Sequence, residues 1–117
     1  MTRDGFRRLA LRMPEAEEAG HMGHPDLRVG GRIFATLGYP DKGWGMVKLM
    51  PDQQEAFVAA EPAVFAPAKG AWGRRGATIV LLRLAKPPSV RVALATAWRN
   101  VAPRALVERT ARRQSAR

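Results

Sequence analysis

Two adjacent glycines, Gly30 and Gly31, link the segments DLRV and RIFATL, and this link most constrains what the chain can fold into. Both flanking segments are short and contain the β-branched and aromatic residues that strands favour. A two-residue Gly-Gly link matches the type I′ or II′ turn of a tight hairpin, which needs positive φ angles. The sequence therefore predicts a β-hairpin with its turn at these glycines.

A second turn extends the hairpin into a meander. The segment GYPDKGWG, residues 38–45, holds a Pro-Asp-Lys-Gly turn and lies between IFATL and MVKL. Ile33, Ala35 and Leu37 alternate with residues that leave the other face of the strand partly polar. We therefore expect three antiparallel strands here.

The chain before the meander has the pattern of a helix. Phe6, Leu9, Ala10 and Met13 recur at the spacing of one buried helix face. Pro14 is expected to end that helix because it cannot continue the hydrogen-bond ladder.

After the meander, a helix and a further strand are predicted. The segment PDQQEAFVAAEP has Pro51 at the first helical position, has acidic and amide residues in its first turn, and closes at Pro62. The run ATIVLLRL, residues 77–84, is rich in β-branched residues and is expected to return to the sheet.

The C-terminal part is predicted to be helical. Ser89 is expected to cap a helix whose buried face consists of Val90, Leu94, Ala97, Trp98 and Val101. Pro103 introduces a last helical segment, RALVERTARR, with three residues expected to face inward: Leu106, Val107 and Ala111.

This order of elements predicts an α+β fold, an antiparallel sheet of hairpins with helices packed on one face. We expect a single domain over residues 1–117, with a basic tail that frays from about residue 112.

The charge balance favours a polyanionic partner. The formal net charge is +10 and the sequence pI is about 11.5, with basic residues concentrated in residues 1–12 and 104–117. Such a balance suits DNA, and the alternative is an acidic protein.

Other composition features bear on location. The chain has no cysteine, which excludes disulfides and fits a reducing compartment. The apolar run ATIVLLRLA is interrupted by Arg83 and is far shorter than the roughly 20 residues of a membrane span. The N-terminus lacks the continuous apolar region of a signal peptide. We expect a cytoplasmic protein without a membrane partner.

Catalytic motifs are missing from the sequence. Ser89 is expected as a helix cap and Ser115 lies in the tail, and neither has a base nearby in the sequence. The stretches GWG and GAWGRRG lack the Lys-Ser/Thr pair of a phosphate loop. We expect no catalytic residue, no cofactor and no enzymatic activity.

The pair His21 and His24, close to Asp26, is the one cluster that resembles metal ligands. Gly23 and Pro25 argue against a helix across this segment, and a turn does not bring both rings to one side in the way a helical motif does. We therefore expect no metal, with a site at the two histidines as the less favoured alternative.

Basic side chains recur at the predicted turns and strand ends. The candidate nucleic-acid-binding residues are Arg28, Arg32, Lys42, Lys48, Lys69, Arg74 and Arg75. Hairpin tips that project such residues can straddle a phosphate backbone. The alternative is that these residues are charged only because turns are solvated.

The tryptophans divide into two groups. Trp44 and Trp72 each stand beside glycine, where they either stack on exposed bases or cover the edge of the core. Trp98 belongs to the buried face of a predicted helix and is expected to be structural.

Three stretches resemble the MmcQ/YjbR-like family of small bacterial proteins: GHPDLRVGGRIFATLGYPDKGWGMVKL, PDQQEAFVAAEPAVFAPAKGAWGRRGATIVLL and ALATAWRNVAP. Ala68 and Lys69 depart from the family pattern. The positions that match it are Gly23, His24, Pro25, Phe34, Ala35, Lys48, Leu49, Gly70 and Trp72.

The resemblance spans about residues 4–108 and implies a double-wing fold, similar to the C-terminal DNA-binding domain of a phage transcription factor. It also implies DNA binding, with the hairpins around Gly30, Gly31 and Lys42 as wings. By the same resemblance, Trp72 would anchor a glycine-rich loop at the edge of the sheet, and Arg74 and Arg75 would be free to contact DNA.

Overall fold

The computed structural model of the chain describes residues 1–21 and 24–115. Its centre is a six-stranded sheet of order β1-β2-β3-β4-β6-β5 in which all neighbours are antiparallel. The strands are β1 (Glu17–His21), β2 (His24–Val29), β3 (Arg32–Leu37), β4 (Trp44–Lys48), β5 (Phe65–Pro67) and β6 (Ala77–Leu81).

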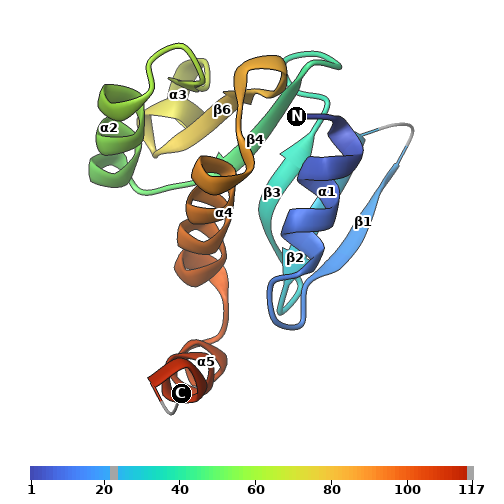
Figure 1. The fold of residues 1–117 in the computed structure, drawn as a ribbon, viewed down its shortest axis with the longest axis vertical. Coiled ribbons are helices and arrows are strands. Elements are labelled where there is room, and N and C mark those ends of the chain that lie inside the picture. Colours follow the sequence, from blue (N-terminus) through green and yellow to red (C-terminus); the bar gives the residue numbers. More distant parts are fainter. Residues whose placement is uncertain (22–23, 116–117) are drawn as a thin grey trace.

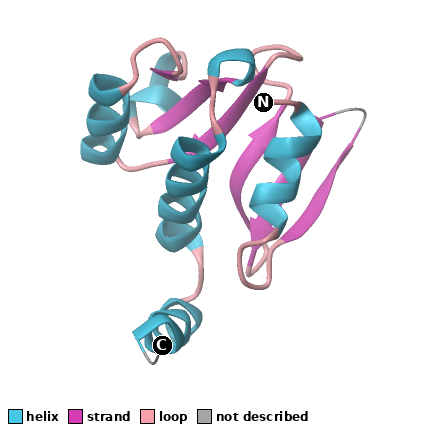
Figure 2. Ribbon diagram, viewed as in Figure 1, coloured by secondary structure: helices cyan, strands magenta, loops and turns pink. Residues whose placement is uncertain are grey.

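In the described part of the chain, five α-helices and one short 3₁₀ helix accompany the sheet (Figure 1). They are α1 (Arg3–Leu11), α2 (Pro51–Ala60), α3 (Gly70–Arg74), η1 (Leu82–Leu84), α4 (Pro87–Val101) and α5 (Arg104–Ser115). Figure 2 shows α1 and α4 side by side in front of the sheet, with α2 beside them and α5 below. The predicted α+β architecture is confirmed. None of the helices in the described residues is both long and apolar enough to cross a membrane.

The main core lies between the sheet and the pair α1 and α4. Phe6 of α1, Leu27 of β2, Phe34 of β3 and Leu94 of α4 are fully buried there. Trp98 is buried in the same core, and its indole Nε1 donates a hydrogen bond to the carbonyl oxygen of Pro14 at 3.0 Å. The prediction that this tryptophan is structural agrees with its place in the core.

The Gly-Gly hairpin forms as predicted. Gly30 and Gly31 have φ angles of 59° and 78°, the positive values that a type I′ turn requires. The strand alternation fails at one position, because Arg28 pairs with Ile33 and Leu27 pairs with Ala35. Phe34 therefore has no partner of its own and forms a β-bulge. The bulge lets both Phe34 and Ala35 be buried, where simple alternation would place them on opposite faces.

Strands β1 and β5 were not singled out from the sequence. Their segments, EEAGH and FAP, are short and carry acidic residues or proline in place of a β-branched run. Pairing with the longer strands β2 and β6 holds them in the sheet.

Two helix details also differ from the prediction. Helix α4 begins at Pro87 with Lys86 as its N-cap, so Ser89 lies inside the first turn and does not cap the helix. Prolines at the first helical positions are tolerated because their missing N–H groups would have no partner there. In α5, Leu106 is buried and Val107 half-buried, but Ala111 is exposed.

Helix α5 projects beyond the C-terminal end of α4 (Figure 1). It is held to the domain by the burial of Leu106 and by an ion pair between Arg109 and Glu15 at 3.6 Å. The link before α5 packs on the Gly-Gly turn, because a Cβ atom at Gly30 would lie 3.0 Å from the ring of Pro103.

Replacing Phe6 with alanine is expected to lower the free energy of unfolding by about 3–5 kcal/mol, because it empties a fully buried site in the main core. Urea denaturation measures this loss. The matched control is Val92→Ala on the exposed side of α4, expected to stay within about 0.5 kcal/mol of the parent protein. Equal losses in the two variants would contradict this assignment of the core.

Candidate nucleic-acid interface

Three of the predicted basic residues meet at one end of the sheet. Because β4 runs antiparallel to both β3 and β6, the start of β3, the end of β4 and the start of β6 lie together. Arg32 is the first residue of β3, Lys48 is the last of β4, and Arg75 follows α3 just before β6. All three side chains line one hollow of about 290 Å³. We call it the cationic hollow.

The three cations of the cationic hollow have no counter-charge within residues 1–21 and 24–115. Among the described residues, the side chains of Arg32, Lys48 and Arg75 make no hydrogen bond or ion pair. Like charges held close together raise the local positive potential, and an anion entering the hollow lowers the energy of all three.

The position of Lys48 is set by a network of side-chain amides below it. Asn100 of α4 uses its Nδ2 to donate to the carbonyl oxygen of Lys48 at 2.9 Å and to Oε1 of Gln53 at 2.8 Å. The same Gln53 oxygen accepts from the backbone nitrogen of Met50 at 2.8 Å. The network joins the end of β4 to α2 and α4, so the backbone at the hollow is held from both sides.

The first five residues of the stretch GAWGRRG form the short helix α3, where a glycine-rich loop was expected. The helix sits close to the chain before it, because a Cβ atom at Gly73 would lie 1.7 Å from the carbonyl oxygen of Ala68. Gly76 has a φ of 114°, and a Cβ atom there would lie 2.0 Å from the carbonyl oxygen of Leu49. Only glycine allows these two approaches.

Trp72 of α3 lines the cationic hollow and is 38% exposed. Its ring meets Tyr39 in a T-shaped contact, with ring centroids 5.3 Å apart and an interplanar angle of 66°. Tyr39 in turn packs on a second, smaller cluster of Met46, Ala68 and Ala77. Met46 alternates in β4 with Val47 of the main core, so this cluster lies on the opposite face of the sheet.

The other predicted basic residues lie apart from the cationic hollow. Arg28 is held by Asp26 in a two-bond pair of 2.8 and 3.2 Å. The hydrogen bonds that Arg28 donates to Asp26, together with the negative charge of that carboxylate, raise the pKa of the Arg28 guanidinium above its ordinary value. Arg28 is therefore already neutralised by a carboxylate. Lys69 is the N-cap of α3 and Arg74 is its last residue, and both are exposed outside the hollow.

Lys42 lies at the opposite end of the sheet. It lines a separate hollow of about 390 Å³ together with Arg3 and Arg83, and the carboxylate of Asp41 belongs to the same lining. The seven predicted residues thus divide between two ends of the molecule and do not form one continuous row. Of this second group, the sequence analysis predicted Lys42 as a binding residue and noted Arg83 only as an interruption of an apolar run.

Sequence reasoning missed Asn100 and Met50 at the cationic hollow. Asn100 carries no motif, and its role depends on the docking of α4 beside the end of β4. Met50 stands just before the predicted helix, where nothing in the sequence indicates that its side chain is 55% exposed in a hollow.

The histidine pair was the alternative metal site. The register of β1 and β2 pairs His21 with His24. His24 is exposed, while the side chain of His21 lies outside the described residues. Within the described part of the chain, no group of three or more His, Cys, Asp or Glu side chains is placed to hold a metal ion.

These features define a small α+β protein with a cationic hollow at one end of an antiparallel sheet. A family model described as YjbR matches residues 11–100, and the chain belongs to the YjbR family. The resemblance seen in the sequence is confirmed. All residues of the cationic hollow except Val101 fall inside the matched region, whereas α5 lies beyond it.

Comparison with solved structures supports the fold. The crystal structure of Deinococcus radiodurans protein DR2400, with family-model domain DUF419, is similar with a TM-score of 0.71 and 19% sequence identity. The match covers 89% of this chain and 80% of that chain. At this identity the likeness concerns the fold alone. A comparison with curated proteins finds no match.

The glycines of α3 allow a matched test of how this helix is seated. Gly73→Ala is expected to cost about 1–3 kcal/mol or more and to weaken the near-UV circular dichroism of the Trp72–Tyr39 pair, because the added carbon meets the Ala68 carbonyl. Gly70→Ala adds the same atom in open space, at a φ of 70°, and is expected to cost about 1–2 kcal/mol of backbone strain with the aromatic signal intact. If both variants keep that signal, α3 is not seated as described.

Proposed function

We propose that this protein is a non-enzymatic DNA-binding protein that contacts the phosphate backbone through the cationic hollow. The observation that carries the proposal is the meeting of Arg32, Lys48 and Arg75 on one hollow without a carboxylate among its lining residues. The hollow near Lys42 includes Asp41 and is the weaker candidate for a polyanion.

The physical basis is neutralisation of phosphate charge. DNA carries about one negative charge per 1.7 Å of helix axis, and each phosphate neutralised by Lys or Arg releases counterions. Three unpaired cations from separate elements suit a run of neighbouring phosphates better than a single small anion. The net charge of +10 adds long-range attraction to any polyanion, without choosing the site of contact.

A charge-matched pair of triple variants tests the site. In Arg32→Ala/Lys48→Ala/Arg75→Ala, we expect weaker binding to duplex DNA and a plot of log affinity against log salt whose slope is shallower by about 3, since each lost phosphate contact removes roughly 0.9. Fluorescence anisotropy with labelled duplex over a range of salt concentrations provides the measurement.

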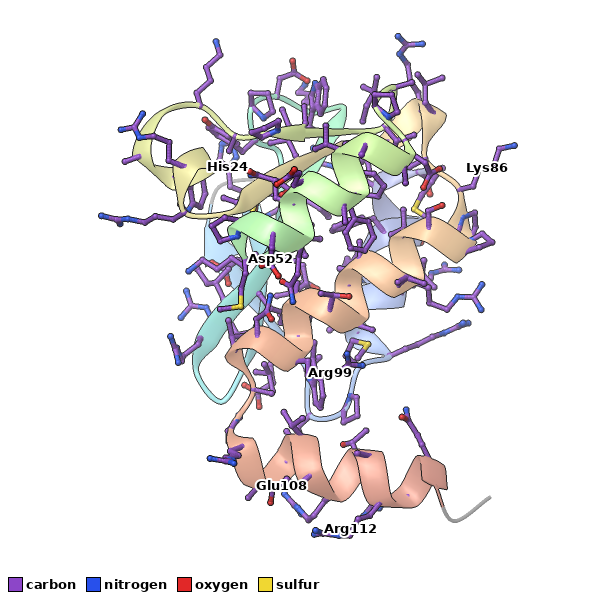
Figure 3. The ribbon with its side chains drawn as sticks, turned by 90° about the vertical axis from the view of Figure 1, so that its left-hand side faces the viewer. His24, Asp52, Lys86, Arg99, Glu108 and Arg112 are labelled. Atoms are coloured by element: carbon purple, nitrogen blue, oxygen red, sulfur yellow. The ribbon has the colours of Figure 1, made fainter. Side chains whose placement is uncertain are left out.

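The matched control is Lys86→Ala/Arg91→Ala/Arg99→Ala. It removes the same charge from three exposed positions, one just before α4 and two along it. Figure 3 labels two of them, Lys86 and Arg99. We expect its salt slope to stay near that of the parent protein. Equal losses in both triple variants would show that only total charge matters and would overturn the proposed site. Absence of duplex binding at low salt, with capture of an acidic protein after nuclease treatment, would favour the protein partner instead.

Two adjacent arginines allow a finer test. Arg75 lines the cationic hollow and Arg74 does not, although both are exposed. Arg75→Ala is expected to make the salt slope shallower by about 1, and Arg74→Ala to leave it unchanged within error. The reverse order would place the DNA on the outer side of α3.

A further inference from the structure

The cationic hollow is also lined by apolar residues that phosphate binding does not require. They are Leu49, Met50, Trp72, Ala77 and Val101. In residues 1–21 and 24–115, four large hydrophobic side chains are exposed: Met50, Trp72, Leu84 and Val92. Two of these four, Met50 and Trp72, line this hollow. Solvent-exposed apolar surface beside a cluster of charged side chains is typical of a ligand site.

The ring of Trp72 is held in place before any ligand arrives. Tyr39 fixes it on one side, and the close approach of Gly73 to Ala68 fixes the helix that carries it. Gln54 adds two hydrogen bonds of 3.0 Å, from its Nε2 to the carbonyl oxygens of Gly73 and Ala77. A ring that is already ordered loses little conformational entropy when a flat ligand stacks on it.

We propose that the cationic hollow takes one unpaired nucleotide of a DNA strand, with its base against Trp72 and Met50 and its phosphates against Arg32, Lys48 and Arg75. The proposal rests on the proposed function and adds the kind of DNA that the site prefers. The volume of about 290 Å³ lies near the lower end of the roughly 300–1,000 Å³ typical of ligand pockets, which suits a single nucleotide.

Cations beside an exposed aromatic ring favour unpaired DNA over duplex DNA for a geometric reason. In a duplex the faces of the bases are stacked on one another, so an intact duplex offers the hollow only its backbone. An unpaired nucleotide offers a free base face as well as phosphates, and stacking of a base on an aromatic side chain depends little on sequence.

Three DNA probes separate the contribution of base stacking from that of phosphate contacts. They are a blunt duplex, the same duplex with a short thymidine overhang, and that duplex with an abasic overhang of equal length. The abasic overhang adds the same phosphates without bases. We expect the thymidine overhang to raise affinity roughly 5- to 150-fold over the abasic one, the range that one stacked base supplies. Anisotropy at a fixed salt concentration measures all three.

Two variants of Trp72 show whether this ring is the cause. Trp72→Leu keeps an apolar side chain against Tyr39 but removes the large aromatic face, and it is expected to abolish the preference for the thymidine overhang while binding the blunt duplex as before. Trp72→Phe keeps an aromatic ring and is expected to retain most of the preference.

The results with the three probes and the Trp72 variants distinguish failure of the nucleotide proposal from failure of the proposed DNA binding. Equal affinity of the parent protein for thymidine and abasic overhangs overturns the nucleotide proposal and leaves backbone binding in place. A preference that survives in Trp72→Leu also overturns it, because the base is then held elsewhere. Loss of blunt-duplex binding in Trp72→Leu assigns the ring to the fold and overturns its role in recognition. Failure of the parent protein to bind any of the three probes removes the proposed function itself.

Discussion

The pairing of β4 with β3 on one side and β6 on the other is the constraint on which the rest of the structure depends. It brings together the ends of three strands that are far apart in the sequence, and with them Arg32, Lys48 and the segment that follows Arg75. Gly45, the second residue of β4, lies close against α1, because a Cβ atom there would lie 3.0 Å from the ring of Phe6. This close approach seats α1 on the core.

The two faces of the sheet have different roles. One face carries the main core under α1 and α4, and its stability comes from buried apolar side chains. On the other face of the sheet, α3 and Tyr39 cover the small cluster around Met46, and α3 places Trp72 beside the cations of the cationic hollow. Helix α5 stands outside both layers and outside the matched family region; the labelled Glu108 and Arg112 point away from α4 (Figure 3).

Local patterns in the sequence predicted most of the fold. The Gly30-Gly31 turn, the helix from Pro51 and the buried face around Trp98 each depend on contacts close along the chain, so spacing and turn chemistry were sufficient. The bulge at Phe34 and strand β5 depend on tertiary pairing, which overrides local propensity. The same difference between local and tertiary information holds for the candidate site. Its cations were recognised one by one from the sequence, but their meeting at the cationic hollow depends on the pairing of β4 with β6.

Backbone amide chemical shifts, mapped during a titration of the whole protein with blunt duplex DNA, show whether DNA is held at this end of the sheet. We expect the largest changes in residues 31–33, 47–49 and 74–77, the three segments that meet at the cationic hollow. Changes concentrated instead around Lys42 and Arg83, or along the exposed side of α4 between Arg91 and Arg99, would contradict this expectation.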